Sequence, residues 1–263
     1  MSKFLDRMER IMLAGPGGMG FGVVRTEKTP GLALIGLVSG SYAKGLATVS
    51  KLVLDAALLS GIDSATGLKR IEKSLPSVPW GVKTSTLTEE SAREFRDGGC
   101  DLLAFSLENT AASALATDDA ARILYIEADI EERELRAIAA LPVDILILPM
   151  KDVTGPWELA NLSAVASITR RTDKYILLEV ANAPSDNDLE ALRNAGVHGL
   201  VLDVAAVGSD TLEKLKAAAL QMPRMRSTGR GRATALVPTS VFPSAAGPER
   251  EEEEEEDEEY DDI

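Results

Sequence analysis

The sequence predicts one (βα)8 barrel, in which eight parallel strands alternate with helices around a closed sheet. Short apolar runs recur between residues 32 and 222, and polar or glycine-containing segments with helical character separate them. The starts of these runs lie about 20 to 31 residues apart, which leaves room for one helix and two short loops each time. Eight such units favour closure over an open doubly wound sheet, because an open sheet would show more polar edge strands.

Most of the apolar runs are uninterrupted over four or more residues, a pattern typical of strands that are buried on both faces of a parallel sheet. The expected strands span residues 32–38, 56–61, 80–84, 101–106, 122–128, 144–150, 175–180 and 199–204.

Helix signals lie between these runs. Thr88 precedes two glutamates and the segment ends at Gly98, so a capped helix is expected there. Ser185 with Asp188, and Asp210 with Glu213, have the spacing of capping boxes. Residues 2–13 predict an amphipathic helix that precedes the first strand and closes the bottom of the barrel.

The charge is distributed unevenly along the chain. The net charge is −14, but residues 249–263 hold twelve acids and one arginine, so the rest of the chain carries only −3. We therefore expect an N-terminal helix and Gly-rich loop (1–31), the barrel (32–222), an extension containing Arg, Pro and Gly (223–248) and a disordered acidic tail (249–263).

Composition excludes several classes of function. One cysteine and one histidine exclude disulfides and the usual zinc sites. A Mg²⁺ ion held by carboxylates at the strand ends stays open as an alternative, but no spacing argues for it, so no metal is expected. His198 precedes the eighth strand, at the bottom of the barrel, which also excludes a Ser–His–Asp triad at the mouth. No basic face predicts nucleic-acid binding. The single cysteine fits a reducing compartment, no apolar segment is long enough for a membrane span, and the first residues lack a signal-peptide layout, so the protein is expected in the cytoplasm.

Residues 15–20 match the pattern G-x-G-x-x-G of dinucleotide-binding loops. That motif requires a preceding strand and a following helix, and the following stretch FGVVRTEKTPG is too short and too broken by Gly and Pro to form one. A loop beneath the barrel is the expectation here.

Candidate catalytic residues lie where the strands end. (βα)8 enzymes carry their chemistry at the C-terminal ends of the strands, and interior layers are built from alternate strands. Lys83, Glu127 and Glu179 fall near the ends of strands three, five and seven, and each interrupts an apolar run. A lysine facing two carboxylates serves in proton transfer or as an electrophilic anchor, and the alternative is a structural ion pair that closes the core.

Lys151, in the segment PMKD just after strand six, is a further catalytic candidate. Here the chain resembles the aldolase-type TIM-barrel superfamily over residues 32–222, at the level of architecture and without matching a particular family. In that superfamily a lysine on strand six often forms a Schiff base, so the resemblance implies this role for Lys151. A solvated loop lysine is the alternative.

Barrels of that superfamily often hold a phosphate with the loops after strands seven and eight. Gly208 and Ser209 open the eighth helix and Asp203 ends the eighth strand, while Ser41 and Lys44 follow the first strand. These five residues are the candidates for contact with an anionic substrate. Residues 182–185 lack the glycine pair expected in the seventh loop, which argues against a flavin phosphate, and the sequence identifies no cofactor.

Two functions follow. The first is an enzyme of the lyase, isomerase or synthase kind that binds a small anionic, phosphorylated or carboxylated metabolite at the barrel mouth. The second is a non-catalytic barrel that serves as a scaffold or binds a basic protein partner through its acidic tail.

Overall fold

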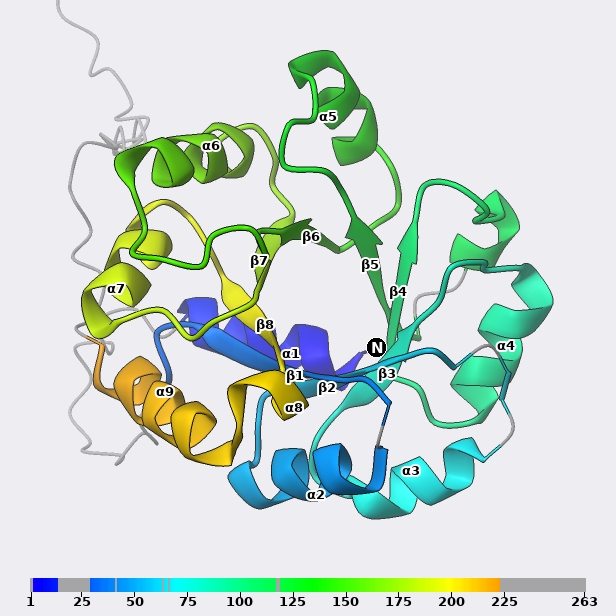
Figure 1. Cartoon of the computed structure of the whole chain (residues 1–263). Coiled ribbons are helices and arrows are strands. Elements are labelled where there is room, and N and C mark those ends of the chain that lie inside the picture. The colour runs from blue at the N-terminus through cyan, green and yellow to red at the C-terminus, as the bar shows by residue number, and fades with distance from the viewer. Residues whose placement is uncertain are drawn as a thin grey trace, which may run out of the picture. The chain divides into compact units, whose positions relative to one another are not determined.

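A computed structural model describes residues 2–13, 29–40, 42–62, 64–65, 67–116 and 119–222. Its centre is a closed barrel of parallel strands in the order β1 to β8, with β8 paired to β1. The helices surround these strands (Figure 1). The predicted (βα)8 barrel is therefore confirmed.

The strands agree with the expected spans to within three residues. Their bounds are β1 Ala33–Val38, β2 Ala56–Ser60, β3 Trp80–Lys83, β4 Leu102–Ser106, β5 Ala121–Tyr125, β6 Ile145–Pro149, β7 Tyr175–Val180 and β8 Gly199–Asp203. The largest difference is at β5, which ends at Tyr125 instead of residue 128. This shift matters, because it decides which residue of β5 lies at the mouth.

The strands separate two apolar layers. Alternate residues such as Ile35, Leu58, Ile123 and Leu177 fill the interior of the barrel, and the residues between them pack against the surrounding helices. Burial on both faces explains why the strands read as continuous apolar runs.

The helices are α1 Lys3–Leu13, α2 Tyr42–Leu52, α3 Leu68–Ser74, α4 Glu89–Asp97, α5 Glu132–Ala139, α6 Leu159–Thr169, α7 Asp186–Asn194, α8 Val204–Val207 and α9 Ser209–Gln221. Between β4 and β5 the expected helix is replaced by a 3-10 helix, η1 Ala112–Leu115. The connection is rich in Ser, Thr, Asn and Asp, which favour turns over helix, and Asn109 adopts a positive φ of 60°. No helix in the described ranges is both long and apolar enough to cross a membrane.

The capping predictions are confirmed in two cases and wrong in one. Thr88 and Ser185 each accept a hydrogen bond from the backbone N–H three residues later, as the N-caps of α4 and α7. Asp210 is not an N-cap, because α9 begins at Ser209 with Gly208 as its N-cap. Gly208 has a φ of 80°, which a residue with a side chain rarely adopts, and this sets the start of the helix.

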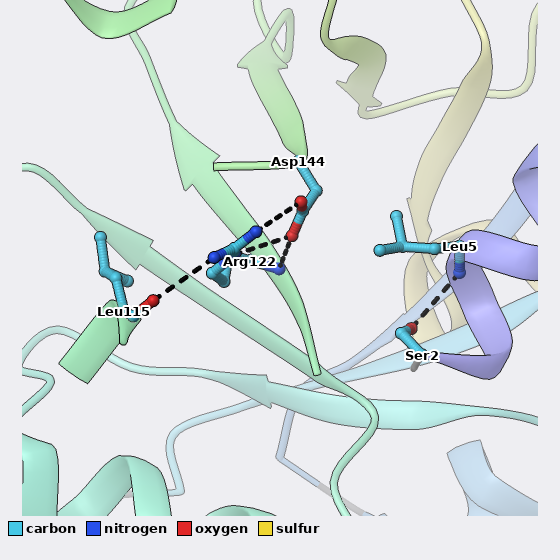
Figure 2. A network of polar contacts seen from close by, with 5 residues as sticks. All are labelled: Ser2, Leu5, Leu115, Arg122 and Asp144. Atoms are coloured by element: carbon cyan, nitrogen blue, oxygen red, sulfur yellow. Dashed lines mark hydrogen bonds and ion pairs between the residues drawn. The ribbon is translucent and has the colours of Figure 1, made fainter. Parts of the chain in front are cut away.

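Helix α1 closes the bottom of the barrel, as expected. Phe4, Met8 and Ile11 pack with the interior residues of the strands. Asp101, which precedes β4, accepts hydrogen bonds of 2.8 Å from the N–H groups of both Lys3 and Phe4. The first turn is completed by the bond from Leu5 N–H to the Ser2 hydroxyl (Figure 2). A carboxylate from the barrel thus caps the helix that plugs it.

Arg122 and Asp144 join β5 to the segment that leads into β6. The Arg122 guanidinium donates two hydrogen bonds, of 3.0 and 2.9 Å, to the two carboxylate oxygens of Asp144, and it also reaches the Leu115 carbonyl (Figure 2). This forked arrangement is the strong form of an arginine–carboxylate pair. The pair holds the start of β5, and with it the position of the whole strand up to the mouth.

Candidate functional site

Three side chains from alternate strands meet at the C-terminal mouth of the barrel. Lys83 ends β3, Tyr125 ends β5 and Glu179 lies near the end of β7. In the strand register Ser60 pairs with Lys83 and Ser106 pairs with Tyr125, so two serines lie beside the cluster. The sequence predicted Lys83 and Glu179 for this layer, and the structure brings these two together.

Glu179 is the centre of the cluster. Its side chain is only 2% exposed, and its carboxylate faces two lysines. Lys83 Nζ lies 3.5 Å from Oε2, and Lys151 Nζ lies 2.8 Å from Oε1. One buried carboxylate therefore serves two ammonium groups, and Lys151 reaches back to the mouth from beyond the end of β6.

Lys83 is the more enclosed of the two lysines, with 29% of its side chain exposed against 56% for Lys151. Burial lowers the pKa of Lys83, Glu179 acts in the opposite direction, and the charge of Lys151 lowers the pKa further. Its Nζ also lies 3.8 Å from the centre of the Tyr125 ring, a cation–π contact. Lys83 is thus a partly desolvated amine held at a defined position.

A cavity of about 430 Å³ opens beside Lys83. Apart from Lys83, its lining consists of hydroxyl-bearing residues, a glycine and an aromatic ring: Ser60, Gly61, Thr84, Ser85, Phe105, Ser106 and Tyr125. Two of the hydroxyls are already used, because Thr84 donates to the Thr86 carbonyl and Ser106 donates to the Glu108 carbonyl. The cavity has the size of a small-molecule site and contains one cation.

Tyr125 is the site residue that sequence reasoning missed. As an aromatic residue in an apolar run, Tyr125 resembles an ordinary core residue. Only the knowledge that β5 ends at Tyr125 would have placed this residue at the mouth of the barrel. Burial raises the pKa of its hydroxyl, and the Glu179 carboxylate raises it further. The hydroxyl is buried beside the Glu179 carboxylate, and within the described residues it makes no hydrogen bond of ordinary geometry.

Glu127 lies two residues beyond β5 and is exposed. It lines a separate groove between the end of β5 and α5, and among the described residues it forms no ion pair with Lys83. The early end of β5 is the physical reason, because it leaves Tyr125 at the depth where Glu127 was expected.

The residues predicted to bind an anion are dispersed. Lys44 and Ser209 are exposed, and the Ser209 hydroxyl donates to Asp210. Ser41 lies outside the described residues, as do the Gly-rich motif at 15–20 and everything from 223 onward, including the acidic tail.

Asp203 has a defined structural role as the N-cap of α8. Its Oδ1 accepts hydrogen bonds from the N–H groups of Ala205 and Ala206, and its Oδ2 accepts one from the Ser39 hydroxyl. Burial alone would raise the pKa of Asp203, but these three hydrogen bonds lower it overall. A carboxylate of the chain itself thus occupies the first turn of the helix after β8, where an anion would otherwise bind.

His198 lies at the bottom of the barrel, as predicted. It precedes β8, its Nδ1 accepts a hydrogen bond from the Ile176 N–H, and its ring makes a T-shaped contact with the ring of Tyr175. In the part of the chain that the structure describes, no three acidic, His or Cys side chains are arranged to hold a metal ion.

Comparisons with known proteins identify the fold. No protein-family model and no curated protein sequence matches the chain. Among solved structures, 3-keto-L-gulonate-6-phosphate decarboxylase from Vibrio cholerae aligns with a TM-score of 0.56 at 10% identity, over 71% of this chain and 95% of that one. N-(5'-phosphoribosyl)anthranilate isomerase from Pyrococcus furiosus gives 0.55 at 12%, over 73% of this chain and 100% of that one.

A mutant tryptophan synthase alpha-subunit from Pyrococcus furiosus gives a TM-score of 0.57 at 11% identity, over 71% of this chain and 96% of that one. These likenesses and the closed parallel sheet confirm the predicted (βα)8-barrel fold. At such low identity the likeness concerns the fold alone.

Proposed function

We propose that this chain is an enzyme of the lyase, isomerase or synthase kind that acts on a small anionic metabolite at the barrel mouth. The observation that carries the proposal is the partly buried Lys83 beside a cavity of about 430 Å³, at the end of the barrel where (βα)8 enzymes carry their chemistry. The structural neighbours include a phosphate-sugar decarboxylase and a phosphoribosyl isomerase, which supports this class of substrate.

In this proposal Lys83 is the acid–base or electrophilic group. Its lowered pKa brings a lysine closer to the range in which an amine exchanges protons with a substrate. Glu179 orients the ammonium through the 3.5 Å contact, and Lys151 supplies a second positive charge on the solvent side. Because Asp203 occupies the first turn of α8, we place the anionic group of the substrate near the two lysines.

The competing interpretation gives the same ion pairs a purely structural role, in a barrel that acts as a scaffold. Its support is that Glu179 already forms an ion pair with each of the two lysines without any ligand. The two interpretations differ in what Lys83→Met does, because a structural ion pair affects stability and a catalytic lysine affects turnover.

The experiment compares the wild type with Lys83→Met and with Lys174→Met, a control just before β7 at the opposite end of the barrel. Each protein is incubated with a panel of small phosphorylated and carboxylated carbonyl compounds, and conversion is followed by proton and phosphorus NMR. The proposal expects conversion by the wild type and by Lys174→Met, and none by a folded Lys83→Met. Absence of turnover in all three, or equal turnover in all three, would contradict it.

A further inference from the structure

Tyr125 occupies a distinctive position at the mouth. It lines the cavity beside Lys83 and also the adjoining groove of about 660 Å³ between β5 and α5, and Ser106 is the other residue common to both. A ligand that fills the cavity therefore lies against Tyr125. The Arg122–Asp144 fork at the far end of β5 holds the strand that carries it.

Within the described part of the fold, the hydroxyl of Tyr125 lies beside the Glu179 carboxylate without a hydrogen bond of ordinary geometry. It is buried and makes no hydrogen bond there, although buried polar groups are almost always paired. Both oxygens of Glu179 face lysines, although Glu179 Oε1 also lacks a hydrogen bond, and Lys83 lies over the Tyr125 ring. An unpaired buried donor that costs stability is typical of a group kept for a ligand.

The Tyr125 hydroxyl and the Lys83 ammonium are both hydrogen-bond donors, and this limits which ligands the site can bind. With its pKa raised, Tyr125 keeps its proton, so the hydroxyl can donate a hydrogen bond throughout the neutral range. Lys83 presents a positive charge at the same place. A donor and a cation side by side fit an oxygen that carries negative charge or a carbonyl dipole.

We propose that Tyr125 is a ligand-binding residue, whose hydroxyl and the Lys83 ammonium together hold one carboxylate or carbonyl oxygen of the small anion. This inference rests on the proposed function of the site and adds a specific recognition group to it. The residue contributes binding and orientation, and the proposal assigns it no covalent step.

The test uses Tyr125→Phe, which removes only the hydroxyl and keeps the ring under Lys83. The matched control is Tyr175→Phe, which removes a hydroxyl at the opposite end of the barrel interior. Acetate, pyruvate and inorganic phosphate are titrated into the wild type and both variants by calorimetry at pH 7. These probes present a carboxylate alone, a carboxylate beside a carbonyl, and a phosphate.

The proposal expects Tyr125→Phe to bind the preferred probe about ten- to a hundredfold more weakly than the wild type, as for a lost hydrogen bond to a charged group. Tyr175→Phe should bind like the wild type. The Tm of Tyr125→Phe should be no lower than that of the wild type, because the lost hydroxyl makes no hydrogen bond of ordinary geometry with the described residues.

Three other outcomes would overturn the assignment of Tyr125, and they can be told apart. If the wild type and Tyr125→Phe bind equally well, the assignment of Tyr125 fails while the proposed function stands. A clear fall in the Tm of Tyr125→Phe would mean that the hydroxyl pairs with Glu179 inside the folded protein, which also overturns the assignment. If the wild type binds none of the three probes, both proposals fail for this class of ligand.

Discussion

The two lysines that share the buried Glu179 carboxylate allow a quantitative prediction about stability. At separations of 3.5 and 2.8 Å, and with an effective dielectric constant of about 20, the direct attractions are about 5 and 6 kcal/mol. The cost of burying the carboxylate offsets most of this. Either lysine alone can compensate Glu179, so Lys83→Met and Lys151→Met should each cost only about 1 kcal/mol, as expected for partly exposed ion pairs.

The double variant removes both counter-ions and leaves a buried charge without a partner, so it should cost about 3–5 kcal/mol. The coupling between the two substitutions is then about 1–3 kcal/mol, well above the error of a double-mutant cycle. The assay is urea unfolding at pH 7 of the wild type, both single variants and the double variant. A control pair, Lys44→Met with Lys69→Met, replaces two exposed lysines and should change the free energy of unfolding by less than about 0.5 kcal/mol per site.

Additive effects of Lys83→Met and Lys151→Met would refute the reasoning, because they would mean that the lysines act on Glu179 independently. A single variant that alone costs 3 kcal/mol or more would also refute it. In that case one lysine would be the structural counter-ion and the other would be a solvated side chain.

Three further predictions concern the ends of the barrel and the tail. Asp101→Ala should cost about 1–2 kcal/mol in urea unfolding, because it removes the acceptor for the first N–H groups of α1. Burial lowers the pKa of His198, so the unfolded chain binds more protons between the lowered pKa and the ordinary histidine value, and stability should fall as the pH drops through that window. His198→Asn should remove this part of the pH dependence, and an unchanged slope would contradict the assignment. Truncation after Pro248 should leave the Tm of the barrel unchanged, since twelve acids in fifteen residues repel one another and bury almost nothing, and a lower Tm would show that the tail packs on the domain.

The sequence was sufficient to predict the architecture because burial on both faces imposes a simple pattern. Each strand of a closed parallel sheet must be apolar over its whole length, so the eight runs stood out and their spans agree with the structure to within three residues. The same pattern exposed Lys83 and Glu179, because a charge inside such a run is conspicuous. The connection between β4 and β5 was predicted to be an α-helix and is a 3-10 helix instead. The prediction followed the strand–helix alternation and gave too little weight to the turn-forming residues of this segment.

The composition of the site was harder to predict, because it depends on where a strand stops. The run from 122 to 128 gave no signal that β5 ends at Tyr125, so Glu127 was placed at the mouth and Tyr125 was taken for a core residue. The position of Lys151 against Glu179 depends on the path of a loop, which periodicity does not report. The same holds for Asp203, whose role as a helix cap follows from the turn after β8.

The central claim is that Lys83 is a partly desolvated amine in a site for small anions. The most direct measurement is an NMR titration of the Lys83 side chain, identified by the loss of its signal in Lys83→Met and followed from pH 6 to 11 with and without pyruvate. We expect a midpoint below the ordinary lysine value, because burial and Lys151 disfavour the charged form. We also expect pyruvate to raise the midpoint, because a bound anion favours the ammonium. A midpoint at the ordinary lysine value, unchanged by pyruvate, would contradict this interpretation and identify Lys83 as a solvated surface lysine.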